Sequence, residues 1–233
     1  KVYNKLITYI NQKPTRNLWK NKACFIGLNG DNNLHIHQMN NVSLETVEKE
    51  QQHIVVDKIY MSAYNSRPNA PYEGAQDQIY RNLEEGAFIY SYMGHAGHTS
   101  IGTNVINITH AKEMTNNLWP VFITATCDVC PFDKDENSVG EELFRNEKGG
   151  FIALYTTTRT VYTTGNEKMN QALLHEFYTP GADGKIRLGD VMRRAKKKML
   201  HDNKGNRISD ANKLKYCLIG DPALAIPLPT HDI

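Results

Sequence analysis

Short apolar runs alternate along the chain with longer segments in which apolar residues recur at helical spacing. The runs at residues 87–92 and 121–126 are rich in aromatic and β-branched residues, which is typical of strands buried on both faces. Together the short runs predict strands at residues 23–28, 57–61, 87–92, 121–126, 151–156 and 217–219. The longer segments predict helices at residues 1–10, 42–52, 75–85, 109–116, 139–144, 168–178 and 188–200.

Repeated alternation of strands and helices predicts an α/β fold with a mainly parallel central sheet and helices on both faces. One predicted helix also has a recognisable beginning. Ser138 and Glu141 have the spacing of a capping box at the start of the helix at residues 139–144. No low-complexity stretch or internal repeat divides the sequence, so we expect a single domain over residues 1–233.

Composition narrows the class of protein without naming an activity. The 233 residues are 40% hydrophobic and 22% charged, as in a globular protein. The net charge of +2 gives no reason to expect a nucleic-acid partner. No apolar run reaches the length of about 18 residues that a membrane span needs. Four cysteines are too few for a disulfide scaffold, so their positions become the question.

Polar and reactive residues follow three of the predicted strands. Asp31 comes after the strand at 23–28, and His95 after the strand at 87–92. Cys127 comes directly after the strand at 121–126. Because reactive groups in open α/β sheets gather at the carboxyl ends of the strands, this pattern predicts a Cys-His nucleophilic site with an acid that orients the imidazole. The flexible backbone around His95 would offer N–H groups to an oxyanion, the candidates being Gly94, Ala96 and Gly97.

The same residues allow other interpretations. His95 and His98 with Cys127 and Cys130 form a formal set of zinc ligands, although 28 residues separate the two pairs. Cys127 and Cys130 also have the spacing of a redox pair, but a loop and not a helix follows them. Cys24 and Cys217 lie in apolar runs and are interpreted as core residues.

Residues 92–97 and 124–128 resemble the His and Cys motifs of the gingipain-like cysteine peptidases. Further stretches resemble the same family in the same order over essentially the whole chain. They lie at residues 29–35, 138–143, 149–159, 187–196 and 218–224. Within the family, they are most similar to the branch of C-terminal signal peptidases, or sortases, of the type IX secretion system (PorU).

The resemblance implies a caspase-like peptidase fold in which Cys127 is the nucleophile, His95 its partner and Asp31 the candidate acid. It implies no metal at the catalytic site and no cofactor for catalysis, and it leaves room for a structural calcium ion. The chain would be a catalytic subdomain, with residues 1–10 a connecting helix from an upstream subdomain. Ala96 departs from the family, which usually has Gly after the catalytic His. If that position needs a positive φ, Ala96 costs about 1 kcal/mol.

The resemblance also implies partners and a location. The expected partners are C-terminal signal domains of secreted cargo, a lipopolysaccharide acceptor and other type IX secretion components, with no nucleic acid. The expected location is the cell surface or outer membrane of a Gram-negative bacterium of the Bacteroidetes type, as part of a larger exported protein. The rival hypothesis is a non-catalytic or zinc-stabilised binding module of the secretion machinery, built on His95, His98, Cys127 and Cys130.

Overall fold

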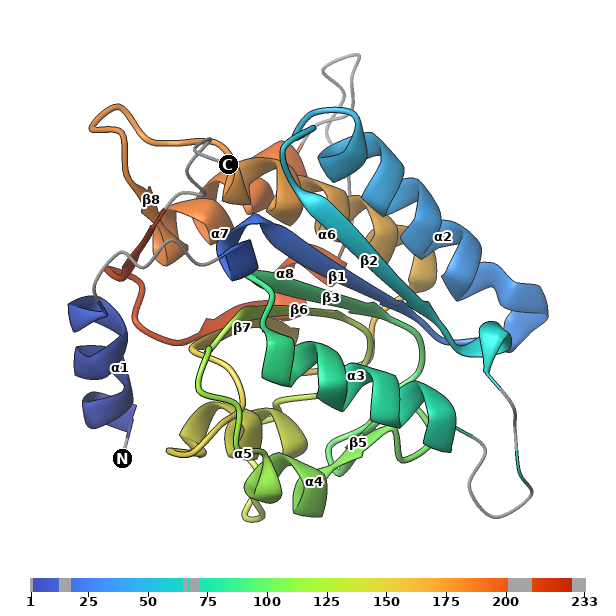
Figure 1. Ribbon diagram of the computed structural model, residues 1–233. Helices are drawn as coiled ribbons and strands as arrows, with labels where there is room; N and C mark the ends of the chain where they lie inside the picture. The colour runs from blue at the N-terminus through green and yellow to red at the C-terminus, as the bar shows by residue number, and fades with distance from the viewer. Residues whose placement is uncertain (1, 13–17, 65–66, 68–71, 201–210, 228–233) are drawn as a thin grey trace.

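The computed structural model describes residues 2–12, 18–64, 67, 72–200 and 211–227, and a six-stranded sheet runs through its centre (Figure 1). The strand order is β2-β1-β3-β6-β7-β9. The first five strands in this order are parallel to one another, and β9 is antiparallel to β7. The strands are β1 (Lys22–Gly27), β2 (Val55–Tyr60), β3 (Ile89–Met93), β6 (Val121–Ala125), β7 (Ala153–Thr157) and β9 (Tyr216–Ile219).

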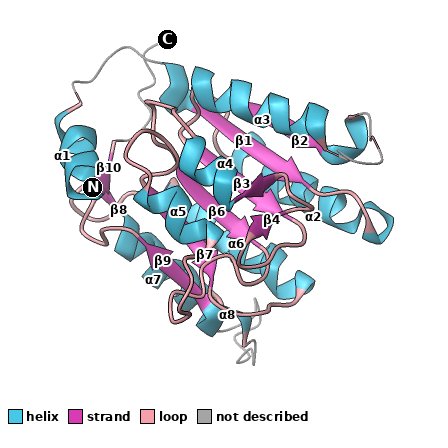
Figure 2. Ribbon diagram, turned by 90° about the horizontal axis from the view of Figure 1, so that it is seen from below, coloured by secondary structure: helices cyan, strands magenta, loops and turns pink. Residues whose placement is uncertain are grey.

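Helices cover both faces of the sheet. One face is covered by α2 (Leu34–Ser43), α6 (Thr163–Phe177) and α7 (Leu188–Lys198). The other face, towards the viewer in Figure 2, is covered by α3 (Glu73–Glu85), α4 (Ile108–Glu113) and α5 (Val139–Arg145). Shorter elements are α8 (Asn212–Lys215), a β4–β5 pair (Ser100–Ile101, Ile106–Asn107) and a β8–β10 pair (Ile186–Arg187, Ala225–Ile226).

The core consists of two apolar layers, one on each side of the sheet. Successive strand residues point to opposite faces, so Phe25 packs in one layer and Cys24 and Ile26 in the other. All five residues of each of the strands β3, β6 and β7 are buried. The predicted α/β class with a mainly parallel sheet is therefore confirmed, with β9 as the antiparallel exception.

The strand predictions end within two residues of the observed strands. The helix predictions are less accurate. The helix predicted at 42–52 is helical only over residues 42–48, because α2 begins at Leu34 and a π-helix, η3 (Leu44–Glu48), continues and ends it. Its buried face includes His35 and Gln38, so the apolar period that marks a helix is weak there. Similarly, α6 begins at Thr163 and not at 168. The predicted capping box is confirmed, since Ser138 accepts from the backbone of Glu141 and the Glu141 side chain accepts from that of Ser138.

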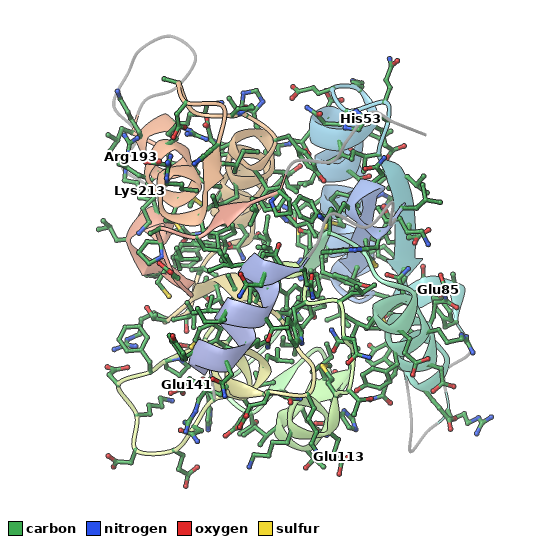
Figure 3. The ribbon with its side chains drawn as sticks, turned by 60° about the vertical axis from the view of Figure 1, so that its left-hand side comes forward. His53, Glu85, Glu113, Glu141, Arg193 and Lys213 are labelled. Atoms are coloured by element: carbon green, nitrogen blue, oxygen red, sulfur yellow. The ribbon has the colours of Figure 1, made fainter. Side chains whose placement is uncertain are left out.

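The first helix, α1 (Val2–Asn11), confirms the predicted leading helix, apart from Lys1, which lies outside the described residues. Figure 3 views the molecule from the side on which α1 lies. Lys5 is buried, and its Nζ donates to the carbonyls of Asn146 (3.0 Å) and Gly149 (2.7 Å). Lys5 thereby fixes α1 to the segment after α5. None of the described helices is long and apolar enough to cross a membrane.

We expect Lys5→Met to lower the free energy of unfolding by about 1–3 kcal/mol, because it removes the amine that donates to one buried and one partly buried carbonyl. Urea denaturation followed by tryptophan fluorescence measures the change. Lys49→Met is the matched control, since its ammonium forms an exposed pair with Glu45 that is worth about 0.5 kcal/mol or less. An equal effect of both substitutions would contradict the anchoring role of Lys5.

Candidate active site

The register of two neighbouring strands brings His95 and Cys127 to the same edge of the sheet. Met93 of β3 pairs with Ala125 of β6 in a parallel ladder. His95 and Cys127 each lie two residues beyond this pair. Since neighbouring strands are about 4.8 Å apart, the two chains leave the sheet side by side. The parallel strands run towards the right-hand side of Figure 1, and the candidate site lies at that end.

Buried hydrogen bonds hold the two strand ends together behind the site. The Thr126 hydroxyl, one residue before Cys127, donates to the carbonyl of Gly94, one residue before His95 (2.5 Å). The carbonyl of His95 accepts from the Tyr92 hydroxyl (2.8 Å) and from the backbone N–H of Gly102 (2.9 Å). The backbone of His95 is therefore fixed, while its side chain is 67% exposed.

Asp31 reaches this edge through an unusual turn after β1. Gly30, Asp31, Asn32 and Asn33 all have positive φ, between 45° and 99°. Asn and Asp tolerate this region better than other non-glycine residues. The turn brings the Asp31 carboxylate to His95, with Oδ2 2.8 Å from Nε2. This hydrogen bond is the main cause that lowers the pKa of Asp31, so the carboxylate is ionised at neutral pH.

The predicted Asp31–His95 neighbourhood is thus observed, while the catalytic role of Asp31 stays a prediction. A third side chain, which the sequence reasoning missed, belongs to the same cluster. His35, at the start of α2, places Nε2 3.3 Å from Asp31 Oδ2. Its ring meets that of His95 edge to face, with centroids 5.0 Å apart. The signal available in the sequence was its position four residues after Asp31.

His35 differs from His95 in its environment. It is buried, and neither of its ring nitrogens makes a hydrogen bond of good geometry. Burial, followed by the charge of His95, lowers the pKa of His35. The imidazole of His35 is therefore neutral at neutral pH, and its nitrogens are unpaired apart from the close approach to Asp31.

Cys127 is half-buried at the end of β6, and its Sγ accepts from the backbone N–H of Val161 (3.5 Å). The Cys127 thiol in turn donates to the carbonyl of Val161 (3.6 Å). Burial disfavours ionisation of the other three thiols. It raises the pKa of Cys130 to about 12, that of Cys217 to about 11 and that of Cys24 well above its usual value. Those three thiols are therefore protonated at neutral pH, as expected of structural cysteines.

The backbone around His95 differs from the expectation in one respect. Among the described residues, five non-glycine residues have positive φ, and Ala96 is not one of them. The strain expected of Ala in this position is therefore absent. Ala96 forms an antiparallel bridge with Ile101, and the N–H of Gly97 donates to the carbonyl of Ser100 (2.9 Å). The oxyanion role of the Gly94, Ala96 and Gly97 amides stays a prediction, and Gly97 would have to give up this bond to act.

The four residues of the zinc alternative do not gather. Within the part of the chain that the structure describes, the group whose donor atoms lie close enough for a metal is Asp31, His35 and His95. Cys130 is buried against α5, where the N–H of Gly140 donates to the carbonyl of Val129. A zinc site built on His95, His98, Cys127 and Cys130 is therefore wrong. Cys127 and Cys130 are both free thiols.

We expect Gly94→Ala to destabilise the protein by about 1–3 kcal/mol, because a Cβ there would lie 2.4 Å from the Tyr92 hydroxyl and 2.5 Å from Leu28 Cβ. Gly97→Ala is the control. A Cβ at Gly97 meets no atom within 4 Å, so the change should stay within about 0.5 kcal/mol. Urea denaturation of the two variants makes the comparison, and a smaller loss for Gly94→Ala than for Gly97→Ala would refute this account of the packing.

Comparison with known proteins shows which family this chain resembles in sequence and in fold. The model of peptidase family C25 matches residues 1–227. A complex of the pro- and mature domains of Porphyromonas gingivalis RgpB is similar, with a TM-score of 0.76 and 20% identity over 97% of this chain. The Arg-specific cysteine proteinase gingipain R (RgpB) gives 0.70 and 21% over 97%. A third structure, of a protease, has a TM-score of 0.74 and 15% identity over 96% of this chain.

This chain spans about half the length of these structures, covering 53%, 52% and 52% of them. Because their sequences are at most 21% identical to this chain, the similarity to these structures shows the fold alone. No curated protein sequence gives a match. The family assignment depends on the model match over nearly the whole chain. The chain belongs to peptidase family C25, the gingipain family of cysteine peptidases.

Proposed function

We propose that this chain carries the catalytic centre of a cysteine peptidase and transpeptidase, with Cys127 as nucleophile and His95 as general base and acid. One observation carries the proposal. His95 and Cys127 stand at the same step beyond the Met93–Ala125 pair of adjacent parallel strands, and the Asp31 carboxylate is hydrogen-bonded to His95. These are the parts of a nucleophile–base–orienting acid arrangement.

The Asp31 contact selects the tautomer of His95. With Nε2–H donating to the carboxylate, the lone pair of the neutral imidazole is on Nδ1. Nδ1 is therefore the nitrogen that takes the proton of the Cys127 thiol. The ionised Asp31 then stabilises the imidazolium that results, as a carboxylate does beside a catalytic histidine.

The reaction proceeds by acyl transfer. The Cys127 thiolate attacks the scissile carbonyl carbon and forms a C–S bond. The C–N bond then breaks as the imidazolium of His95 gives its proton to the leaving amine, which leaves a thioester. In the second half, an amine or a water molecule attacks the thioester and gives its proton to His95. The C–S bond breaks, and the product is a new amide or a free carboxylic acid.

For the substrate, we propose the C-terminal secretion signals of type IX cargo proteins, with transfer of the cargo to a surface lipopolysaccharide. The support is the ordered similarity of residues 29–35, 138–143, 149–159, 187–196 and 218–224 to the signal peptidase branch of the family. The protein would then act at the cell surface as part of a larger exported protein, together with other secretion components. Hydrolysis alone, as by a proteinase like gingipain R, is the competing outcome.

The nucleophile is tested by alkylation. We expect iodoacetamide at neutral pH to label Cys127 before the other three thiols, whose burial keeps them protonated. His95→Ala should slow the labelling of Cys127 about tenfold or more, because the base is removed. His98→Ala is the control and should leave the rate unchanged. Peptide mass spectrometry measures each site, and equal labelling of all four thiols would count against the proposal.

Transfer is tested with the full-length protein and a peptide that contains the junction between cargo and its C-terminal signal. We expect an added amine to appear in an amide product, in proportion to its concentration, while the rate of substrate loss stays constant. This follows if thioester formation limits the rate and the amine and water compete afterwards. The carboxylic acid as sole product would refute transfer and leave the peptidase assignment intact. Absence of cleavage with wild-type protein would refute both.

A further inference from the structure

Three side chains at the edge of the sheet have metal-binding atoms that converge. The donor atoms of Asp31, His35 and His95 all lie within 4.8 Å of one another. Asp31 Oδ2 is 2.8 Å from His95 Nε2 and 3.3 Å from His35 Nε2. A tetrahedral Zn²⁺ ion with ligand bonds of about 2.0–2.1 Å separates its donors by roughly 3.3–3.5 Å. One observed separation lies at the lower end of that range and the other about 0.5 Å below it, so small rotations that move the Asp31 and His95 side chains apart would accommodate an ion.

The second observation is the state of His35. Its side chain is only 3% exposed, and both of its ring nitrogens lack a hydrogen-bond partner. Buried polar atoms in proteins are rarely left unpaired, because desolvation without a partner costs about 1–3 kcal/mol. The Nε2 atom of this imidazole faces the Asp31 carboxylate. A cation shared with Asp31 and His95 would give that nitrogen a partner.

The donor set indicates which cation. Two imidazoles and one carboxylate suit zinc and similar transition metals, whereas calcium and magnesium prefer oxygen ligands. The site is also open to solvent on one side, since the side chains of Asp31 and His95 are 50% and 67% exposed. An ion can therefore enter from solvent and keep a water molecule as its fourth ligand.

We propose that Asp31, His35 and His95 bind a Zn²⁺ ion, and that this ion switches the peptidase off. Binding requires the Nε2 lone pair of His95, so the proton of the neutral ring moves from Nε2 to Nδ1. Nδ1 then carries a proton and can no longer accept one from Cys127. At the same time, the Asp31 carboxylate binds the ion and no longer accepts a hydrogen bond from His95. Inhibition in this form depends on the proposed function, whereas zinc binding itself does not.

Binding is tested first, on metal-free chain and without any activity assay. Titration with Co²⁺, followed by its visible absorption, and with Zn²⁺, followed by calorimetry, should show a single ion per chain. Asp31→Asn and His35→Gln should each weaken binding about tenfold or more. His37→Ala is the matched control, because His37 is exposed on the same helix and should leave binding unchanged.

Two variants are used so that a loss of zinc binding is not confused with a loss of folding. His35 is buried and its replacement perturbs packing, whereas Asp31 lies in an exposed turn. Circular dichroism compares both with the wild type. Zinc binding that is equally strong in Asp31→Asn and in the wild type would overturn the site, as would absence of binding to wild-type chain at micromolar zinc.

Inhibition is tested on the full-length enzyme. Zinc should abolish cleavage of the junction peptide, and a chelator should restore it. In His35→Gln, the zinc concentration that halves the remaining activity should rise about tenfold or more. An unchanged value would mean that zinc inhibits through the Cys127 thiolate, and would overturn the switch. A wild-type protein that binds zinc at the three residues but cleaves nothing would refute the proposed function and leave the metal site standing.

Discussion

The parallel register of β1, β3 and β6 decides where each reactive side chain emerges. Gly27 pairs with Met93, and Met93 pairs with Ala125, so the three strands end at the same level. A slip of one residue would turn the side chains of a strand to the opposite face of the sheet. Because β3 and β6 are buried on both faces, such a slip would expose or misplace apolar core residues. Core packing, and not attraction between His95 and Cys127, therefore fixes the geometry of the site.

The two sides of the site are built in different ways. Behind His95 and Cys127, the backbone is close-packed, with Gly94 in a space that holds no side chain and its carbonyl bonded to Thr126. Asp31, by contrast, is presented by a turn with positive φ at four successive residues, at a cost of about 1 kcal/mol for each non-glycine residue. Such local strain persists where the surrounding structure compensates for it, and it limits the orientations that the Asp31 carboxylate can adopt.

The sequence predicts the sheet well and the details of the site less well. The strands are continuous apolar runs because both of their faces are covered, so their pattern is unambiguous. The helix α2 is hidden because His35 and Gln38 occupy its buried face, and apolar periodicity is the signal on which the prediction depends. Asp31 is found because reactive residues follow strands. His35 is not, since a helical histidine acquires meaning only when the turn before it brings Asp31 close.

The solvent exposure of Asp31 and His95 bears on both the proposed catalysis and the proposed regulation by zinc. The hydrogen bond between Asp31 and His95 lies in water, where charges interact weakly, and covering the site would strengthen it. In the proposed mechanism, a bound substrate segment would supply such a cover and would also keep water from the thioester, as transfer to an amine requires. The same uncovered edge admits a small cation when no substrate is present. Under the two proposals, substrate and zinc need different tautomers of His95, one with the lone pair on Nδ1 and the other with it on Nε2. Whichever occupies the edge of the sheet would then determine which nitrogen of His95 can react.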